Sequence, residues 1–226
     1  MPTVALIGPD GAGKTTISRM LERAEAVPCK YLYMGIDIPA SNIALPTARW
    51  IERLKLRSRP GHRPAGPAPR QPRRTLRGWA WAYARLVHRL ADEWFRQAVS
   101  WIYQARGFVV LYDRHFAFDF AQEIAGADEP LDRRLHRWCL QYLYPHPDLV
   151  LFLDAPGAVL FARKGESDVA ELERRRQGFL ALGRHTSGFV RVDATRPTQE
   201  VYHDVVSHIA RLRASGPGVP QPGGPR

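Results

Sequence analysis

Short runs of apolar residues recur along the chain, and segments with helical spacing lie between them. Such continuous apolar runs are typical of strands buried on both faces of a parallel sheet. The predicted strands are residues 4–7, 31–36, 108–112, 149–153 and 189–192. The predicted helices are residues 16–26, 79–106, 131–142, one basic helix within about 160–178, and 199–213. The alternation predicts an α/β fold with a central parallel sheet covered by helices on both faces.

The longest predicted helix, residues 79–106, carries apolar residues at helical spacing and ends before Gly107, which suits a C-terminal cap. The apolar positions are Leu86, Leu90, Phe95, Ala98 and Ile102. We expect the aromatic side chains of this helix to lie in the core.

A chain of 226 residues has room for one such domain, which we place at residues 1–214. Residues 215–226 contain four Pro and four Gly and are expected to be disordered. No apolar run approaches the ~18 residues of a membrane span, and the first strand leaves no room for a secretory signal. Cys29 and Cys139 lack metal-ligand spacing. Together these features predict a soluble cytoplasmic protein with reduced thiols.

The formal net charge of +11 is concentrated in one segment. Residues 49–77 hold ten Arg or Lys residues against the single acid Glu52, which is +9 of the +11. Five Pro residues between 58 and 72 exclude one regular helix or strand there, so a flexible basic insertion is predicted. The segment is either a solvated surface loop or a contact for an anionic acceptor, a membrane surface or nucleic acid.

The segment GPDGAGKT at residues 8–15 matches the phosphate-binding spacing GxxxxGK[ST] between a predicted strand and a predicted helix. Backbone NH groups of such a loop, with the helix N-terminus behind them, attract a polyphosphate. Lys14 is expected to reach the β and γ phosphates of ATP, and the Thr15 hydroxyl to ligate Mg²⁺. The predicted nucleotide-binding residues of this segment are Gly8, Asp10, Gly11, Ala12, Gly13, Lys14, Thr15 and Thr16.

Charged residues also end two of the predicted strands. Asp113 is expected to hold Mg²⁺ through water or to orient an acceptor hydroxyl, and Arg114 to grip an acceptor phosphate with its planar fork. The alternative for these two is a strand-end ion pair. Asp154 is a candidate second metal ligand, or a cap for the helix that begins after Pro156.

A second basic cluster follows Asp154, and we interpret it as a lid over about residues 160–178. Arg163 and Lys164 are the predicted catalytic cations of this lid. Arg174, Arg175 and Arg176 fit a salt-bridged exposed helix equally well. The turn formed by Thr195, Arg196 and Pro197 is expected to contact the nucleotide base.

In order and wording these motifs resemble the thymidylate kinase family of nucleoside monophosphate kinases. The matching segments are GPDGAGKTT, YDRH at 112–115, LVLFLDAP at 149–156 and VDATRPTQEV at 192–201. The resemblance implies a P-loop kinase fold in which Asp10 contacts the acceptor's sugar hydroxyl, Arg114 its phosphate, and Arg163 and Lys164 the transferring phosphoryl group. It also implies that the lid supplies the catalytic cation, as in bacterial-type members, since the glycine loop has no arginine.

The chain departs from this family on the acceptor side. YMGIDIPASN stands where the family carries an Arg-Glu-Pro type segment, and Asp119 and Gln122 are the nearest equivalents of its base-reading residues. We therefore expect transfer of the γ-phosphate of MgATP to a small phosphorylated acceptor, with dTMP or another nucleoside monophosphate leading. The alternatives are a kinase of a sugar, glycan intermediate or other metabolite, and a nucleotide-dependent switch or nucleic-acid-binding protein. A homodimer is compatible with the sequence.

Overall fold

A computed structural model describes residues 1–24, 27–35, 41–57, 75–116, 118, 130–165 and 167–215. The strands are β1 (Thr3–Ile7), β2 (Cys29–Tyr33), β3 (Val109–Asp113), β4 (Leu149–Asp154) and β5 (Phe189–Asp193). The helices are α1 (Lys14–Arg23), α2 (Pro46–Arg57), α3 (Leu76–Ala105), α5 (Leu131–Tyr142), α6 (Gly157–Lys164), α7 (Val169–Gly183) and α8 (Thr198–Ser215).

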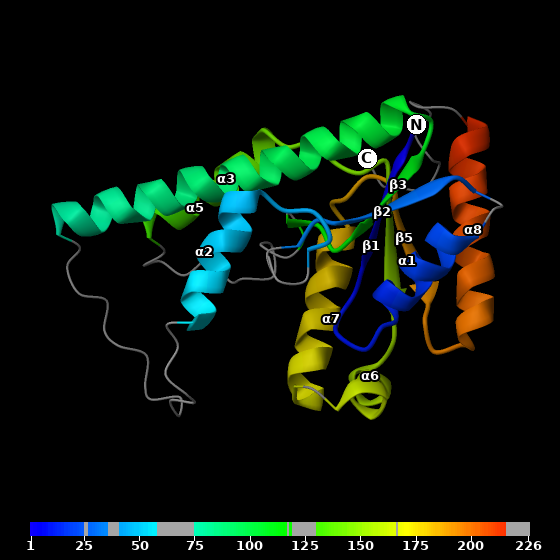
Figure 1. The fold of residues 1–226 in the computed structure, drawn as a ribbon. Coiled ribbons are helices and arrows are strands. Elements are labelled where there is room, and N and C mark those ends of the chain that lie inside the picture. Colours follow the sequence, from blue (N-terminus) through cyan, green and yellow to red (C-terminus); the bar gives the residue numbers. More distant parts are fainter. Residues whose placement is uncertain are drawn as a thin grey trace.

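The five strands form one sheet in the order β2-β3-β1-β4-β5, and every neighbouring pair is parallel. This confirms the predicted α/β fold with a central parallel sheet. The central strand β1 pairs Leu6 with Asp113 of β3 and Ile7 with Phe152 of β4. The carboxyl ends of these three strands therefore lie side by side at one edge of the sheet (Figure 1).

Two apolar clusters fill the space on either face of the sheet. On one face the strands pack against α1 and α8, through Ile17, Leu21, Val205 and Ile209 among others. On the other face they pack against Leu140 of α5, Phe116 and Tyr144, with Leu90 of α3 at the border. Burial on both faces explains why β1, β3 and β4 have continuous apolar sequences.

The local structure departs from the predictions at two places. Residues 46–57, for which no element was predicted, form helix α2, which ends just before the predicted insertion at 58–72. The basic stretch after β4 is two helices because α6 ends at Gly165, which adopts a left-handed conformation with φ of 66°. The predicted insertion at 58–72 and the tail beyond Ser215 lie outside the described residues.

The prediction that the aromatic residues of α3 lie in the core was also wrong for its tryptophans. Trp79, Trp81, Trp94 and Trp101 are all at least 36% exposed, as are the two tryptophans outside this helix. The side of α3 that faces the protein instead carries polar residues. Asp92, Glu93, Arg96, Gln97 and Ser100 are each no more than 2% exposed.

Cys29 and Cys139 are free thiols and both are buried. Burial raises the pKa of Cys29 to about 11, so this thiol is unreactive at neutral pH. In the described part of the chain, no helix combines the length and the apolar character needed to cross a membrane.

His115, directly after the DR pair, lies in the core among aromatic rings. Its ring stands 5.4 Å from that of Tyr112 and 5.0 Å from that of Phe116, and neither ring nitrogen has a hydrogen-bond partner. Burial, together with the nearby His146, lowers the pKa of His115 from 6.5 to about 3. The imidazole is therefore neutral in the folded protein throughout the physiological range.

We expect this histidine to make the protein acid-sensitive. Below pH 6.5 the unfolded chain takes up a proton at His115 while the folded protein does not, so the free energy of unfolding falls with decreasing pH. Between pH 7 and pH 5 the loss attributable to His115 is about 2 kcal/mol. Urea unfolding of the native chain and of His115→Gln at both pH values measures it. An equal pH dependence in the two proteins would contradict the assignment.

Candidate functional site

The glycine loop lies between the carboxyl end of β1 and the start of α1. Gly11 and Gly13 adopt left-handed conformations with φ of 86° and 89°. A Cβ at Gly11 would lie 2.7 Å from the backbone oxygen of Leu160 in α6, so only glycine fits this position. The loop is thus tightly curved and packed against the start of the predicted lid.

Lys14, the first residue of α1, folds back over the loop. Its Nζ donates hydrogen bonds of 2.8 Å to the carbonyl oxygens of Gly8 and Pro9, and the residue is only 7% exposed. The ammonium group is held at the mouth of the loop, where the sequence predicts the phosphates. Thr15 and Thr16, next on α1, are exposed, whereas Ala12 is buried.

Asp113 at the end of β3 meets the loop from the neighbouring strand. Its Oδ2 accepts a 2.8 Å hydrogen bond from the Thr15 hydroxyl and a 3.1 Å hydrogen bond from the Tyr31 hydroxyl of β2. Burial and the Asp113 carboxylate raise the pKa of Tyr31, which keeps this phenol protonated as a donor. Tyr31 was not among the predicted site residues, because its contact with Asp113 depends on the pairing of β2 with β3.

Thr15 and Asp113 present two oxygen donors that fit the ligand chemistry of Mg²⁺. A hydroxyl and a carboxylate oxygen 2.8 Å apart are the kind of oxygen donors that Mg²⁺ takes when substrate phosphates and water supply the rest. Among the described residues no group of three or more His, Cys, Asp or Glu could hold a metal by itself.

Asp10 in the loop is surrounded by cations from three parts of the chain. Its carboxylate forms ion pairs with Arg114 after β3 at 2.6 Å and with Arg175 of α7 at 3.4 Å. Burial alone would raise the pKa of Asp10, but Arg114, Lys14, Lys164 and Arg175 outweigh it and hold the pKa below its usual range. Of the predicted cations, Lys14, Arg114 and Lys164 thus lie close to Asp10 of the loop, and Arg175 joins them.

Arg114 is held in an unusual backbone conformation. Its φ is 63°, in the left-handed region that non-glycine residues avoid, while its NH bonds to the Leu6 carbonyl at 3.3 Å. A strained conformation of this kind persists where the surrounding structure enforces it, and it is frequent at functional sites. Here it aims the guanidinium at Asp10 instead of continuing the strand.

This strain predicts that glycine is more stable than alanine at position 114, the reverse of their order in a helix. Both variants lose the ion pair with Asp10, so the difference between them reports the backbone conformation alone. Arg114→Gly is expected to be more stable than Arg114→Ala by about 1 kcal/mol, because glycine adopts positive φ freely. Chemical denaturation of the two variants measures the difference. At the exposed helical residue Ala210, glycine should instead destabilise by about 1 kcal/mol. The same sign at both positions would contradict the strained conformation.

Asp154 at the end of β4 is enclosed by arginines. Its two carboxylate oxygens accept hydrogen bonds of 2.6 and 3.1 Å from Arg176 of α7, and Arg191 of β5 lies 2.5 Å away. The residue is 3% exposed, and its side chain does not cap α6, whose first NH bonds to Glu173 at 3.0 Å. This geometry favours a structural ion-pair cluster over either role predicted for Asp154.

Asp154→Asn tests that structural role. Removing this buried charge leaves Arg176 with Glu173 but without its buried partner, so the free energy of unfolding should fall by about 2 to 4 kcal/mol. Arg191→Gln should cost less than about 1 kcal/mol, because the Arg191 side chain is 60% exposed. Thermal and chemical unfolding of both variants measure these changes. An Asp154→Asn variant as stable as the native chain would contradict the structural role.

Arg163 of the predicted lid contacts the predicted base-side turn instead of the glycine loop. Arg163 Nη2 donates to the Thr195 carbonyl at 3.4 Å, and Arg196 pairs with Asp204 of α8 at 2.6 Å. The Thr195 NH and hydroxyl both donate to Asp193 and, with the nearby Arg196 and Arg191, lower the pKa of that carboxyl. Pro197 begins the turn into α8, accepting from the NH groups of Glu200 and Val201. Lys164, in contrast, is near enough to Asp10 to affect its pKa.

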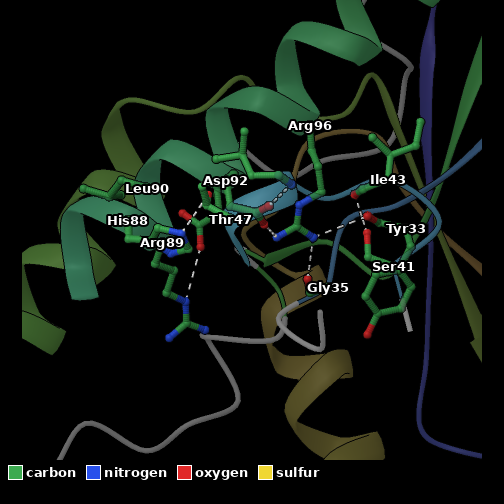
Figure 2. Close-up of polar contacts among 12 residues, drawn as sticks. Tyr33, Gly35, Ser41, Ile43, Thr47, His88, Arg89, Leu90, Asp92 and Arg96 are labelled. Atoms are coloured by element: carbon green, nitrogen blue, oxygen red, sulfur yellow. Dashed lines mark hydrogen bonds and ion pairs between the residues drawn. The ribbon is translucent and has the colours of Figure 1, made fainter. Parts of the chain in front are cut away.

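The segment at the end of β2 is held by a buried ion pair of α3 (Figure 2). Arg96 lies 2.5 Å from Asp92 and donates to the carbonyl oxygens of Tyr33 and Gly35 at the end of β2. Asp92 in turn accepts from the NH of Leu45, just before α2. The segment that departs most from the resembled family is therefore tied to α3. Asp119 and Gln122 lie outside the described residues.

No protein-family model matches the sequence, and curated proteins give no significant match.

Proposed function

We propose that this protein is a kinase that transfers the γ-phosphate of MgATP to a small phosphorylated acceptor, most simply a nucleoside monophosphate such as dTMP. The observation that carries the proposal is the convergence of Lys14, Thr15, Asp113 and Arg114 around the glycine loop. In this reading the described domain is a P-loop fold, with the loop NH groups and the N-terminus of α1 facing the phosphates of ATP.

Each residue has a distinct part in the proposed reaction. Lys14 would stabilise the negative charge that develops on the transferring phosphoryl group. Thr15 and Asp113 would hold a Mg²⁺, which would supply positive charge to neutralise the phosphates. Tyr31 keeps Asp113 oriented through its 3.1 Å hydrogen bond. Lys164 and Arg175, both close to Asp10, are better placed to act as the catalytic cations than Arg163, which contacts Thr195.

The ion pairs of Asp10 support a phosphorylated acceptor in preference to a bare alcohol. The Arg114 side chain is 36% exposed and Arg175 41%, so an incoming anion can reach both guanidinium groups. A phosphate would replace Asp10 as their partner, and Asp10 would then be free to accept a hydrogen bond from an acceptor hydroxyl.

Lys14→Met is expected to abolish this activity without unfolding the protein. Loss of a cation at the transferring phosphoryl group should lower turnover by about 10³ or more. Lys30→Met is the matched control. Lys30 is on β2 and lies over the ring of Phe108, away from the glycine loop. The assay is ATP consumption with product identification across nucleoside monophosphates, sugar phosphates and neutral metabolites. Unchanged turnover in folded Lys14→Met protein would refute the kinase proposal.

The acceptor class is read from the same screen. Phosphorylation of a nucleoside monophosphate, lost in Arg114→Ala while ATP binding persists, is the expected result. Phosphorylation of a neutral metabolite with a silent Arg114→Ala would instead leave a kinase with a different acceptor.

A further inference from the structure

A cavity of about 190 Å³ opens between the first half of α3 and the start of α5. Ala82 and Leu86 of α3 form its apolar wall, and both are buried. Arg85 and Arg89 of α3 and Arg133 of α5 place three guanidinium groups around it. Its volume is below the roughly 300–1,000 Å³ of sites for drug-sized ligands, so the cavity suits a small ligand.

A buried polar contact joins the two helices beside this cavity. His136 of α5, which also lines the cavity, lies 2.9 and 3.0 Å from the two carboxylate oxygens of Glu93 on α3. Both residues are no more than 2% exposed. The contact fixes α3 and α5 relative to each other, so the arginines of the two helices surround a preformed space. A preformed site binds more tightly, because less conformational freedom is lost when the ligand enters.

The lining of the cavity carries an excess of positive charge. Against its three arginines it has one acid, Asp132, which leaves +2 when His136 is neutral. Glu93, behind His136, lowers this sum to +1 and pairs with Arg89 at 3.5 Å. A guanidinium group has five NH donors, so a contact with one carboxylate leaves donors for a ligand. An anion bound among the three arginines would therefore be attracted by all of them and would reduce their mutual repulsion.

The residue types around the cavity favour a phosphate group over a carboxylate. The planar fork of arginine matches pairs of oxygens on either anion. A phosphate monoester offers three terminal oxygens, enough for Arg85, Arg89 and Arg133 together, whereas a carboxylate offers only two. The apolar wall formed by Ala82 and Leu86 suits an organic group attached to that phosphate. A small phosphate ester therefore fits the lining better than a simple inorganic anion.

The cavity is separate from the glycine loop. Asp113, Arg114 and Arg175, which contact residues of the loop, do not line the cavity. In Figure 1 α5 lies along the first half of α3, which extends beyond the sheet, whereas the loop joins β1 to α1. A ligand between α3 and α5 would leave the loop accessible, so this inference does not depend on the proposed function.

We propose that the space between α3 and α5 is a binding site for a small phosphate ester, held by Arg85, Arg89 and Arg133. The probes are phenyl phosphate and inorganic phosphate, titrated by calorimetry at constant ionic strength into Lys14→Met protein, whose glycine loop has lost its cation. Both should bind, phenyl phosphate more tightly, because its ring would contact Ala82 and Leu86. Binding to the native chain alone would assign the phosphate to the glycine loop and overturn the proposal. Equal affinity for the two probes would contradict an ester ligand.

Neighbouring arginines of α5 provide a matched pair of variants. In Lys14→Met protein, adding Arg133→Gln should weaken phenyl phosphate binding at least about tenfold, because a charge-assisted hydrogen bond is lost. Arg85→Gln should weaken it similarly. Arg134→Gln should leave the affinity unchanged, because Arg134 is exposed and does not line the cavity. Glutamine is nearly as compatible with a helix as arginine, so the fold should persist, which circular dichroism checks. Equal weakening in Arg133→Gln and Arg134→Gln would indicate a general attraction of anions to this basic chain and overturn the proposal.

Discussion

The parallel pairing of β1 between β3 and β4 is the constraint on which the candidate site depends. Because Leu6 is in register with Asp113 and Ile7 with Phe152, the loops that follow these strands emerge at one edge of the sheet. Thr15 and Asp113, 98 residues apart in the sequence, meet there at 2.8 Å. A shift of one residue in this register would turn the Asp113 side chain to the opposite face of the sheet. The apolar burial that fixes the register thus also positions the polar residues.

Two carboxylates at this edge are paired with arginines, yet their surroundings differ. Asp154 is 3% exposed and sealed between Arg176 and Arg191, so exchanging its partners would require opening the structure. Asp10 and its partners Arg114 and Arg175 are partly open to solvent. A surface ion pair contributes little to stability and can be exchanged for a ligand at low cost. An aspartate paired with arginines therefore stabilises the sheet edge at Asp154. At Asp10 the same kind of pair can be exchanged for an anionic ligand.

Helix α3 connects the end of β2 to the outer surface of the protein. Its inward residues Asp92 and Arg96 hold the end of β2 and the start of α2, which requires charge on the side that ordinarily carries the apolar stripe (Figure 2). Its outward side carries Trp81 and Trp101, which are 71% and 47% exposed. The polar contacts that hold β2 and α2 therefore leave large apolar side chains of α3 at the surface.

The sequence by itself determined the strands, the parallel sheet and the glycine loop, because apolar runs and glycine spacing are local signals. It placed Asp113 and Arg114 beside the loop, since parallel strands present their carboxyl ends at one edge. It did not reveal Tyr31 or Arg175, whose contacts depend on strand order and on the packing of α7. It also misjudged α3, because helical spacing shows that a helix has two sides but not which side faces the protein. Only the tertiary structure decided that, through the buried polar contacts of Asp92, Glu93 and Arg96.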